Sequence, residues 1–268
     1  MKILFTICGR AGSKGIKNKN IREFVGKPLP YYTISAIDLF LKETSSDIEA
    51  DIVVNSDSRE LLELMKNNPL RRIETIERDE SLAGDTIGKI AVINDCRLKM
   101  EERKHKKYDM IIDLDITSPL RTVENIEQLI AKQFESKADV TTSVTTARRN
   151  PYFNQVMKTE HGYKKVIASN FTARQQAPEI YDMNASLYAY SPEFLKSGKG
   201  VLDGYCECIE MYDTGVLDLD HENDFELMEV IAKYLFSKNV RSSDLNWEKY
   251  ITIYRQSIIW KKNMVRIS

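Results

Sequence analysis

Short apolar runs alternate with amphipathic segments along most of this chain, and this alternation restricts the fold more than any other feature of the sequence. The runs rich in β-branched and apolar residues, which predict strands, cover residues 2–8, 51–55, 109–114, 138–145 and 185–190. The segments with apolar residues three and four positions apart, which predict helices, cover residues 31–43, 59–67, 86–102, 123–136 and 222–237. Such alternation is typical of a mostly parallel sheet with helices on both faces. The predicted fold class is therefore α/β.

The chain of 268 residues fits one large domain better than two independent ones. The strand–helix alternation lapses between residues 148 and 183, a stretch rich in Arg, Gln, Asn, Pro and aromatic residues without a clean period. An insertion of this length is usually functional, as a lid or an oligomerisation arm. We predict a main domain at residues 1–237 with this inserted arm at 148–183, followed by a helical tail at 238–268 with an apolar stripe.

Composition excludes several classes of function. Lys and Arg number 39 against 40 Asp and Glu, so a net charge of −1 gives no global attraction to nucleic acid or to an anionic membrane. The N-terminal apolar run is too short for a secretory signal or a membrane span, and we expect a cytoplasmic protein. The four Cys form no CxxC pair, the three His are isolated, and neither G-x-S-x-G nor H-E-x-x-H occurs. A zinc site, a disulfide framework and a serine hydrolase are therefore disfavoured.

The first predicted strand runs directly into a glycine-rich basic loop at residues 9–20, GRAGSKGIKNKN. In parallel α/β sheets, ligands bind beyond the C-terminal ends of the strands. Its three glycines allow close approach of backbone N–H groups to a ligand, and Arg10, Lys14, Lys17 and Lys19 surround them with cations. The loop matches neither the Walker A nor the dinucleotide-binding spacing. These features predict a polyphosphate cradle, with a solvated basic turn as the alternative.

An acidic pair follows late in the chain. Asp218 and Asp220 are two residues apart, so a strand would present both on one face. Two carboxylates near phosphates suit Mg²⁺, which prefers oxygen ligands and substrate phosphates. The alternative is a pair of solvated carboxylates at a sheet edge.

A second acidic motif, DLDIT, places Asp113 and Asp115 at the end of an apolar strand. It matches the D-x-D-x-T motif of haloacid-dehalogenase-like phosphatases, in which the first Asp takes a phosphoryl group and Mg²⁺ binds both carboxylates. Those phosphatases carry the motif on their first core strand and need a later G-D-x-x-x-D, which is absent here. The phosphatase remains the rival enzyme class.

Taken together, these motifs resemble those of the acylneuraminate cytidylyltransferase family, whose opening pattern is R-x-G-S-K-G-[ILV]-x-x-K-N. The matching blocks follow in order at residues 10–20, 56–57, 78–86, 117–121 and 218–225. Within the family the chain is most similar to the legionaminate branch, through residues 113–121, 148–154, 173–178 and 181–186. It departs from sialate synthetases at Asp115, where Gln is usual, and from the common pattern at Ala11, where Gly is common.

The resemblance implies a Rossmann-like domain, Mg²⁺, and a homodimer in which the arm reaches the partner's active site. It implies that CMP is transferred from CTP to a nonulosonic acid. Residues for phosphates and ribose would be Arg10, Ser13, Lys14, Lys19 and Asn20, and those near the base Arg78, Ala83, Thr86 and Ser118. Asp115 and Thr117 would also bind substrate, and the sugar would meet Arg149, Arg174, Gln175 and Asn184. Arg10, Lys14, Lys19, Asp218 and Asp220 would be catalytic, with the two Asp as metal ligands. A Kdo-type cytidylyltransferase, differing in the sugar pocket, and a non-catalytic nucleotide sensor remain alternatives.

Overall fold

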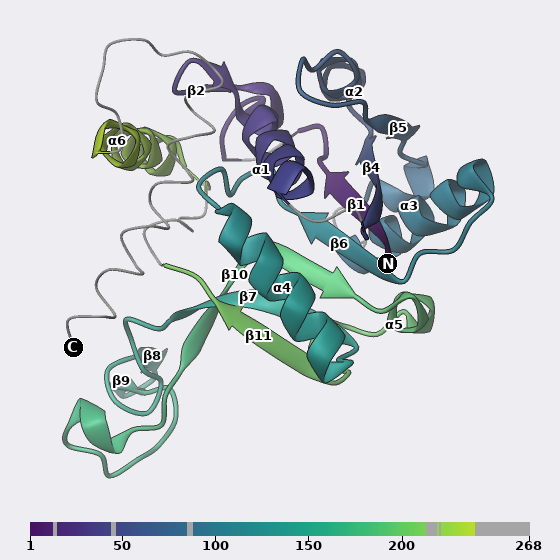
Figure 1. Ribbon diagram of the computed structural model, residues 1–268. Helices are drawn as coiled ribbons and strands as arrows, with labels where there is room; N and C mark the ends of the chain where they lie inside the picture. The colour runs from purple at the N-terminus through teal and green to yellow at the C-terminus, as the bar shows by residue number, and fades with distance from the viewer. Residues whose placement is uncertain (13–14, 44–46, 85–87, 213–218, 220, 239–268) are drawn as a thin grey trace.

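A seven-stranded sheet lies at the centre of the computed structural model (Figure 1), which describes residues 1–12, 15–43, 47–84, 88–212, 219 and 221–238. In spatial order its strands are β11 (Cys206–Glu210), β7 (Val140–Thr146), β10 (Tyr181–Tyr190), β6 (Met110–Leu114), β1 (Lys2–Cys8), β4 (Glu49–Ser56) and β5 (Glu74–Glu77). Every neighbouring pair is parallel except those made by β10, which runs antiparallel to both β6 and β7. The predicted mostly parallel sheet is confirmed.

Helices cover both faces of this sheet, because alternate residues of its strands enter two separate cores. Ile3, Phe5 and Ile7 of β1 pack in the larger core with α1 (Leu29–Glu43), α2 (Arg59–Lys66), α4 (Val123–Ser136) and α6 (Glu222–Lys238). Leu4 packs in the smaller core with α3 (Lys89–Lys104) and α5 (Pro192–Ser197). The α/β fold class with helices on both faces is confirmed.

Local sequence signals explain where several helices begin. Thr122 caps α4 by accepting a hydrogen bond from the backbone N–H of Asn125, whose side chain accepts the Thr122 N–H in return. Ser58 caps α2 by accepting a hydrogen bond from the backbone N–H of Leu61. Each such cap contributes about 0.5–2 kcal/mol to helix stability. Capping therefore fixes α2 and α4 at the residues where their periodic patterns start.

Two strands of the main sheet were not predicted from the sequence. β5 is short, and β11 alternates Cys and Glu, so neither presents a long β-branched or apolar run. Smaller elements are the pairs β2 (Glu23–Phe24) with β3 (Lys27–Pro28) and β8 (Val156–Thr159) with β9 (Gly162–Lys165), and the 3₁₀ helices η1 (Lys19–Ile21), η2 (Glu80–Leu82) and η3 (Arg174–Gln176). These turns and short hairpins are too brief for their periodicity to be read.

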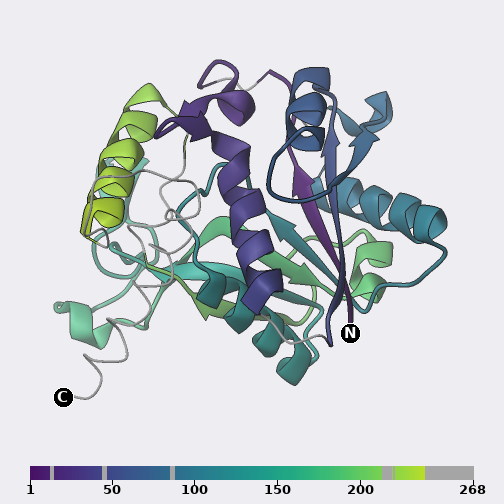
Figure 2. The same ribbon diagram turned by 45° about the horizontal axis from the view of Figure 1, so that its top comes forward.

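The predicted arm is an excursion from the sheet between β7 and β10. It contains the β8–β9 hairpin and η3, and it projects from the body of the molecule in two views (Figures 1 and 2). β10 already begins at Tyr181, so the excursion ends before the predicted limit of residue 183. Whether the arm serves dimerisation stays a prediction, as do the boundaries of the main domain, and the tail at 239–268 lies outside the described residues.

Within the described part of the chain, no helix has both the length and the apolar character needed to cross a membrane.

Candidate active site

The order of the strands creates a switch point between β1 and β6. After β1 the chain adds β4 and then β5 on one side, and it later crosses back to add β6 on the other side of β1. Ligands of open α/β sheets bind at such a point, beyond the carboxyl ends of the strands. The basic loop leaves β1 at this edge, and the segment from Asp115 to Ser118 leaves β6 beside it.

The loop begins with a glycine that packing requires. A Cβ on Gly9 would lie 2.5 Å from Cδ2 of Leu61 and 3.0 Å from Cδ1 of Ile116, so a larger residue would require these two side chains to shift. The backbone N–H of Ala11 donates to Oδ1 of Asp57 at 2.7 Å, and the Asn20 amide donates to the carbonyl of Arg10 at 3.0 Å. The loop is thus folded tightly over the ends of β1 and β4. The predicted residues Ser13 and Lys14 lie outside the described residues.

The basic loop also contacts the segment that carries the predicted metal ligands. Nζ of Lys19 donates to the backbone carbonyl of Leu219 at 2.5 Å, although 200 residues separate them. Arg22 forms an ion pair with Glu222 at the start of α6, and the N–H of Val25 donates to Oε1 of Glu229 at 2.8 Å. Figure 2 shows α6 beside the chain that follows β1.

Leu219 stands between Asp218 and Asp220, which themselves lie outside the described residues. The described contact therefore brings the cationic loop to within one residue of both predicted magnesium ligands. No group of three or more His, Cys, Asp or Glu side chains suited to a metal occurs among the described residues.

Arg78, which the resemblance implies near the cytosine base, lies at the base of the loop. Its Nε donates to Oδ1 of Asn55 at 2.7 Å, and its Nη2 donates to the carbonyl of Gly9 at 2.9 Å. Asn55 is the penultimate residue of β4, is fully buried, and its Nδ2 has no hydrogen-bond partner in the described structure. Sequence reasoning missed Asn55, although a polar residue closing an apolar strand was a usable signal. Ala83 directly follows η2 as its C-cap, and Thr86 lies outside the described residues.

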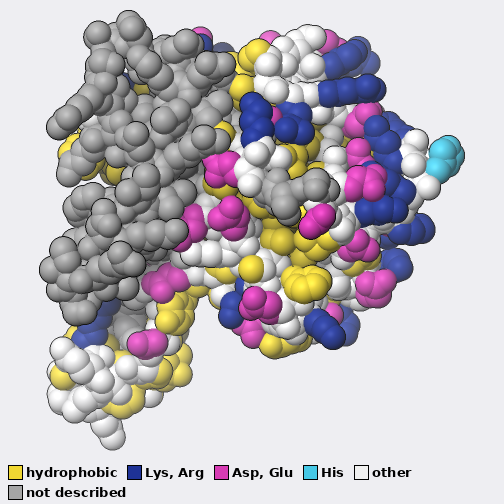
Figure 3. Space-filling view, in the orientation of Figure 1, with side chains coloured by type: hydrophobic (Ala, Val, Ile, Leu, Met, Phe, Trp, Pro, Cys, Tyr) yellow, Lys and Arg dark blue, Asp and Glu magenta, His cyan; other side chains and the backbone are white. Residues whose placement is uncertain are grey.

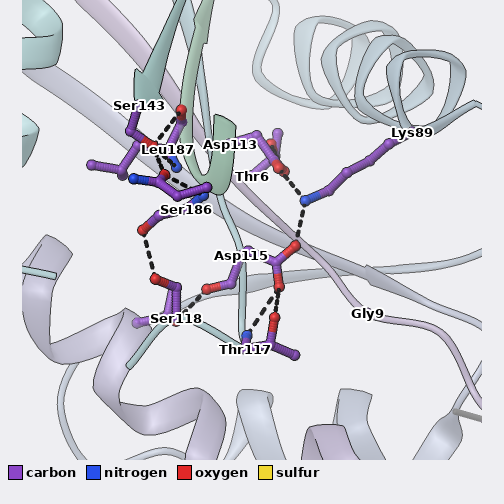
Figure 4. A network of polar contacts seen from close by, with 12 residues as sticks. Thr6, Gly9, Lys89, Asp113, Asp115, Thr117, Ser118, Ser143, Ser186 and Leu187 are labelled. Carbon is purple, nitrogen blue, oxygen red and sulfur yellow. Dashed lines mark hydrogen bonds and ion pairs between the residues drawn. The ribbon is translucent and has the colours of Figure 1, made fainter. Parts of the chain in front are cut away.

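A charged network closes the end of β6 (Figure 4). Nζ of Lys89, the first residue of α3, lies 2.7 Å from Oδ2 of Asp113 and 2.9 Å from Oδ2 of Asp115. Asp113 also accepts from the Thr6 hydroxyl at 2.8 Å, and Oδ1 of Asp115 accepts from the Thr117 N–H and hydroxyl at 2.9 and 2.8 Å. Lys89 was not among the predicted site residues.

The pKa values in this network follow from burial and charge. Burial would raise the pKa of Asp115, but the Lys89 ammonium and the Thr117 donors outweigh it and hold that pKa well below its usual range. Burial would lower the pKa of Lys89, but the two carboxylates raise it well above its ordinary value. Lys89 is therefore an ammonium ion and Asp115 a carboxylate at neutral pH.

The phosphatase alternative finds no support in this geometry. The ammonium of Lys89 occupies the position between Asp113 and Asp115 where that mechanism needs Mg²⁺. The side chain of Asp113 is fully buried and accepts from Thr6, so its carboxylate is not presented to a substrate as a nucleophile. The motif also lies on β6 and not on the first strand of the sheet.

The remaining residues of the β6 segment join β10. The Ser118 hydroxyl donates to Oγ of Ser186 at 2.8 Å, and the fully buried Arg121 donates to the carbonyl of Asp115. Oδ1 of Asn184 accepts from Ser143 at 2.6 Å, while its buried Nδ2 has no partner in the described structure. Because an unsatisfied buried donor costs about 1–3 kcal/mol, this amide is suited to a ligand acceptor. The structure thus brings Asp115, Thr117, Ser118 and Asn184 together.

The other predicted sugar-binding residues lie on the arm, away from this edge of the chain's own sheet. Arg174 and Gln175 lie on η3, where Arg174 donates to the carbonyl of Ala147 at 3.1 Å. Arg149 follows β7 and donates to the carbonyl of Arg148 at 3.2 Å. Figure 1 shows the arm well separated from the end of β1. Within one chain, these three side chains do not join the network around Asp115.

Comparison with known proteins agrees with this geometry. Residues 4–235 match the model of a family described as Cytidylyltransferase. The chain is 34% identical to Post-translational flagellin modification protein B of Campylobacter coli, over 91% of this chain and 99% of that protein. It is 33% identical to the CMP-N,N'-diacetyllegionaminic acid synthase of Campylobacter jejuni, with the same coverage.

Among solved structures, the chain resembles CMP:2-keto-3-deoxy-manno-octonic acid synthetase complexed with CTP. The TM-score is 0.63 at 13% identity, over 87% of this chain and 99% of that one. HddC from Yersinia pseudotuberculosis gives a TM-score of 0.51 at 12% identity, with the same coverage of both chains. At these identities the likeness concerns the fold, which is Rossmann-like as predicted.

Proposed function

The chain belongs to the cytidylyltransferase family of nucleotidyltransferases, and from that premise we propose that it transfers CMP from CTP to a nonulosonic acid of the legionaminic or sialic type. The anomeric hydroxyl of the sugar is the acceptor, and pyrophosphate is released. The observation that carries this proposal is the contact between Lys19 and Leu219, which joins the basic loop to the acidic segment at one edge of the sheet.

The names of the relatives support the choice of sugar. A CMP-N,N'-diacetyllegionaminic acid synthase matches over nearly its whole length, and an N-acylneuraminate cytidylyltransferase of Streptococcus agalactiae is 25% identical over 56% of its length. A Pseudaminic acid cytidylyltransferase of Campylobacter jejuni is 29% identical over about half of this chain. All three names refer to nonulosonic acids, so a legionaminic-type sugar is the first substrate to test.

The donor chemistry of the acidic segment fits Mg²⁺. Asp218 and Asp220 offer two hard carboxylate ligands, and the described Leu219 between them is held by Lys19 of the basic loop. Mg²⁺ held by these two residues would neutralise charge on the triphosphate.

The chain's own residues account for the rest of the reaction. The C2 hydroxyl of the sugar gives its proton to solvent and its oxygen forms a bond to the α-phosphorus of CTP, while the bond from that phosphorus to the oxygen of the β-phosphate breaks and pyrophosphate leaves in line. Arg10, Lys14 and Lys19 counter the charge on the phosphoryl oxygens, so positioning and electrostatics carry most of the rate acceleration. Arg78 and Asn55 hold the base of the loop against β4.

A homodimer would complete the sugar site. The arm exposes large apolar side chains, with Val156, Met157 and Tyr163 at 58%, 50% and 70% exposure, and Figure 3 shows apolar surface along this lobe. Exposed apolar area of this kind favours burial against a second protein surface. Arg149, Arg174 and Gln175 would then reach the sugar bound by the partner subunit. We also propose a cytoplasmic enzyme, since CTP is made in that compartment.

The direct test is incubation with CTP, Mg²⁺ and single acids from a panel: N,N'-diacetyllegionaminic, N-acetylneuraminic, pseudaminic and Kdo. Pyrophosphate release should be fastest with the legionaminic acid and absent with CTP alone. Preference for Kdo would replace the sugar assignment. CTP binding without pyrophosphate release from any acid would identify a nucleotide sensor instead.

A further inference from the structure

Lys89 places a positive charge at the switch point between β1 and β6. It is the first residue of α3, directly after Gly88, and its side chain returns to the end of β6 (Figure 4). Its Nζ meets Asp113 at 2.7 Å and Asp115 at 2.9 Å, while Thr6 of β1 donates to the far oxygen of Asp113. One ammonium thus bridges the carboxylate of Asp113 in β6 and that of Asp115 directly after this strand, beside the neighbouring strand β1.

The two carboxylates are not equivalent. Asp113 has a fully buried side chain and serves as the anchor for Lys89 and Thr6. The side chain of Asp115 is 26% exposed, and two donors from Thr117 occupy its Oδ1. Its Oδ2 receives one described donor, the ammonium of Lys89. Since a carboxylate oxygen accepts about two hydrogen bonds, Oδ2 retains acceptor capacity on a partly exposed side chain.

We infer that Lys89 is a positioning residue, which fixes the Asp115 carboxylate so that Oδ2 accepts a hydrogen bond from an N–H or O–H group of the substrate. This inference rests on the proposed function and specifies one contact of its site. A carboxylate without a proton offers no donor, so the contact selects groups that donate. Both substrates carry such groups: the exocyclic amine and the ribose hydroxyls of CTP, and a hydroxyl or acetamido N–H of the acceptor sugar.

Lys89 makes this selection possible because the two aspartates would otherwise repel each other. Without the ammonium, one carboxyl would tend to hold a proton, and a protonated acid can rotate to donate instead of accept. Charge-assisted hydrogen bonds are roughly twice as strong as neutral ones. Loss of this contact should therefore change the KM of one substrate and leave the KM of the other nearly unaltered.

The test compares the variants K89M, K89R and D115N and the double variant K89M/D115N, with steady-state kinetics against CTP and against the sugar separately. We expect K89M to raise the KM of one substrate by about 10- to 100-fold, and K89R to retain part of the affinity. In the D115N background, K89M should change that KM by less than about threefold, because both substitutions remove one contact. The affected substrate identifies whether CTP or the acceptor sugar supplies the donor.

A matched control is available on the same helix. Lys99 of α3 pairs with Asp95 at 2.8 Å and is 35% exposed, against 34% for Lys89. K99M should keep both KM values. K89M leaves Asp113 buried and charged, which could prevent folding. In that case the double variant D113N/K89M removes the charge, and the two KM values are measured on it instead. Thermal melting verifies folding of each variant.

Four outcomes distinguish a failure of the inference about Lys89 from a failure of the proposed function. A folded K89M with unchanged KM values, or effects of K89M and D115N that multiply, would overturn the inference and leave the proposed function standing. Equal rises in both KM values would likewise assign Lys89 a purely structural role. Absence of turnover by the wild-type enzyme with every acid would overturn the proposed function together with this inference.

Discussion

The loop after β1 and the end of β6 border the same edge of the sheet, but they carry charge in opposite ways. Residues 9–22 contain five Lys or Arg and no Asp or Glu, so this stretch is complementary to an anion such as a triphosphate. At the end of β6, Asp113 and Asp115 surround the ammonium of Lys89 and exceed it by one charge. The first region is suited to binding phosphate, and the second to recognising a donor group on a substrate.

The difference also shows in how each region is held. The loop is held largely through its own backbone groups, such as the N–H of Ala11 that donates to Asp57 and the carbonyl of Gly9 that accepts from Arg78. The end of β6 is fixed by side chains that contact each other, including Thr6, Lys89 and Thr117. Substitutions of loop side chains should therefore change the binding and reaction of the phosphates. Substitutions at the end of β6 should change both substrate selectivity and the stability of the fold.

The largest effect is expected from D220A, which removes one predicted metal ligand beside the loop. Pyrophosphate release should fall by about 10³-fold or more, because the metal stabilises charge that grows in the transition state. CTP binding, measured by calorimetry, should persist because the cations of the loop remain. Unchanged turnover in D220A would show that Asp220 does not hold the metal. The loop region would then lack the metal site on which its assigned role in phosphate binding depends.

K19A should reduce kcat/KM by about 10- to 100-fold, which corresponds to the loss of a charge-assisted hydrogen bond. The matched control is K17A, since Lys17 lies in the same loop with an exposed side chain. K17A should stay within about threefold of the wild type. Equal losses in the two variants would mean that the loop acts through its total charge and not through the contact at Leu219.

Sequence patterns were sufficient for the elements whose periodicity is long. The fully buried β6 and the amphipathic α4 appear at their predicted positions, because burial on both faces and an apolar stripe leave clear traces in sequence. The convergence of the loop with Asp218 and Asp220 stays a prediction, which the contact of Lys19 with Leu219 supports.

The site residues that the sequence did not predict gain their roles from tertiary contacts. Lys89 lies 24 residues before Asp113 at the start of a helix, and no spacing rule relates the first residue of a helix to the end of the next strand. Asn55 gains its role only because β4 ends beside Gly9 and Arg78. The two aspartates at the end of β6 could be identified from the sequence, but the position of the Lys89 ammonium between them could not.

The pH dependence of stability offers a smaller effect that is specific to β6. In the wild type the depressed pKa of Asp115 contributes stability above about pH 4, its unfolded value, and this stability is lost only as pH falls through the lower folded value. Lys89, whose pKa is raised, contributes fully below about pH 10. Neither contribution changes between pH 5 and 8 in the wild type.

K89M should reverse this behaviour. Burial and repulsion between Asp113 and Asp115 would then raise one carboxyl pKa above its unfolded value, so the folded state is favoured by protonation. Urea unfolding should show K89M losing about 1–3 kcal/mol more at pH 8 than at pH 5, equivalent to one or two pKa units. A loss independent of pH would contradict a mutual repulsion of the two carboxylates.

Other groups around the network do not obscure this measurement. A hydrogen bond with Cys96 and burial raise the pKa of the Cys8 thiol, and burial raises the pKa of Tyr188 and of Tyr190. These groups stay neutral between pH 5 and 8.

The smallest expected effect comes from R78K at the base of the loop. Arg78 donates through Nε to Asn55 and through Nη2 to Gly9, a two-pronged geometry that a single ammonium does not reproduce. The variant should lose about 1 kcal/mol of unfolding free energy, the net contribution of one hydrogen bond, measured by urea unfolding at neutral pH. R72K is the control, because Arg72 is 90% exposed and its contact with Glu74 is 3.7 Å long.

R78K also sharpens the contrast between the two regions. If Arg78 acts by holding the loop against β4, the KM for CTP should rise in R78K while the dependence of rate on sugar concentration stays as in the wild type. A rise in the sugar KM instead would mean that the base of the loop and the end of β6 form one continuous substrate surface, and the division of labour between phosphate binding and donor recognition would be wrong.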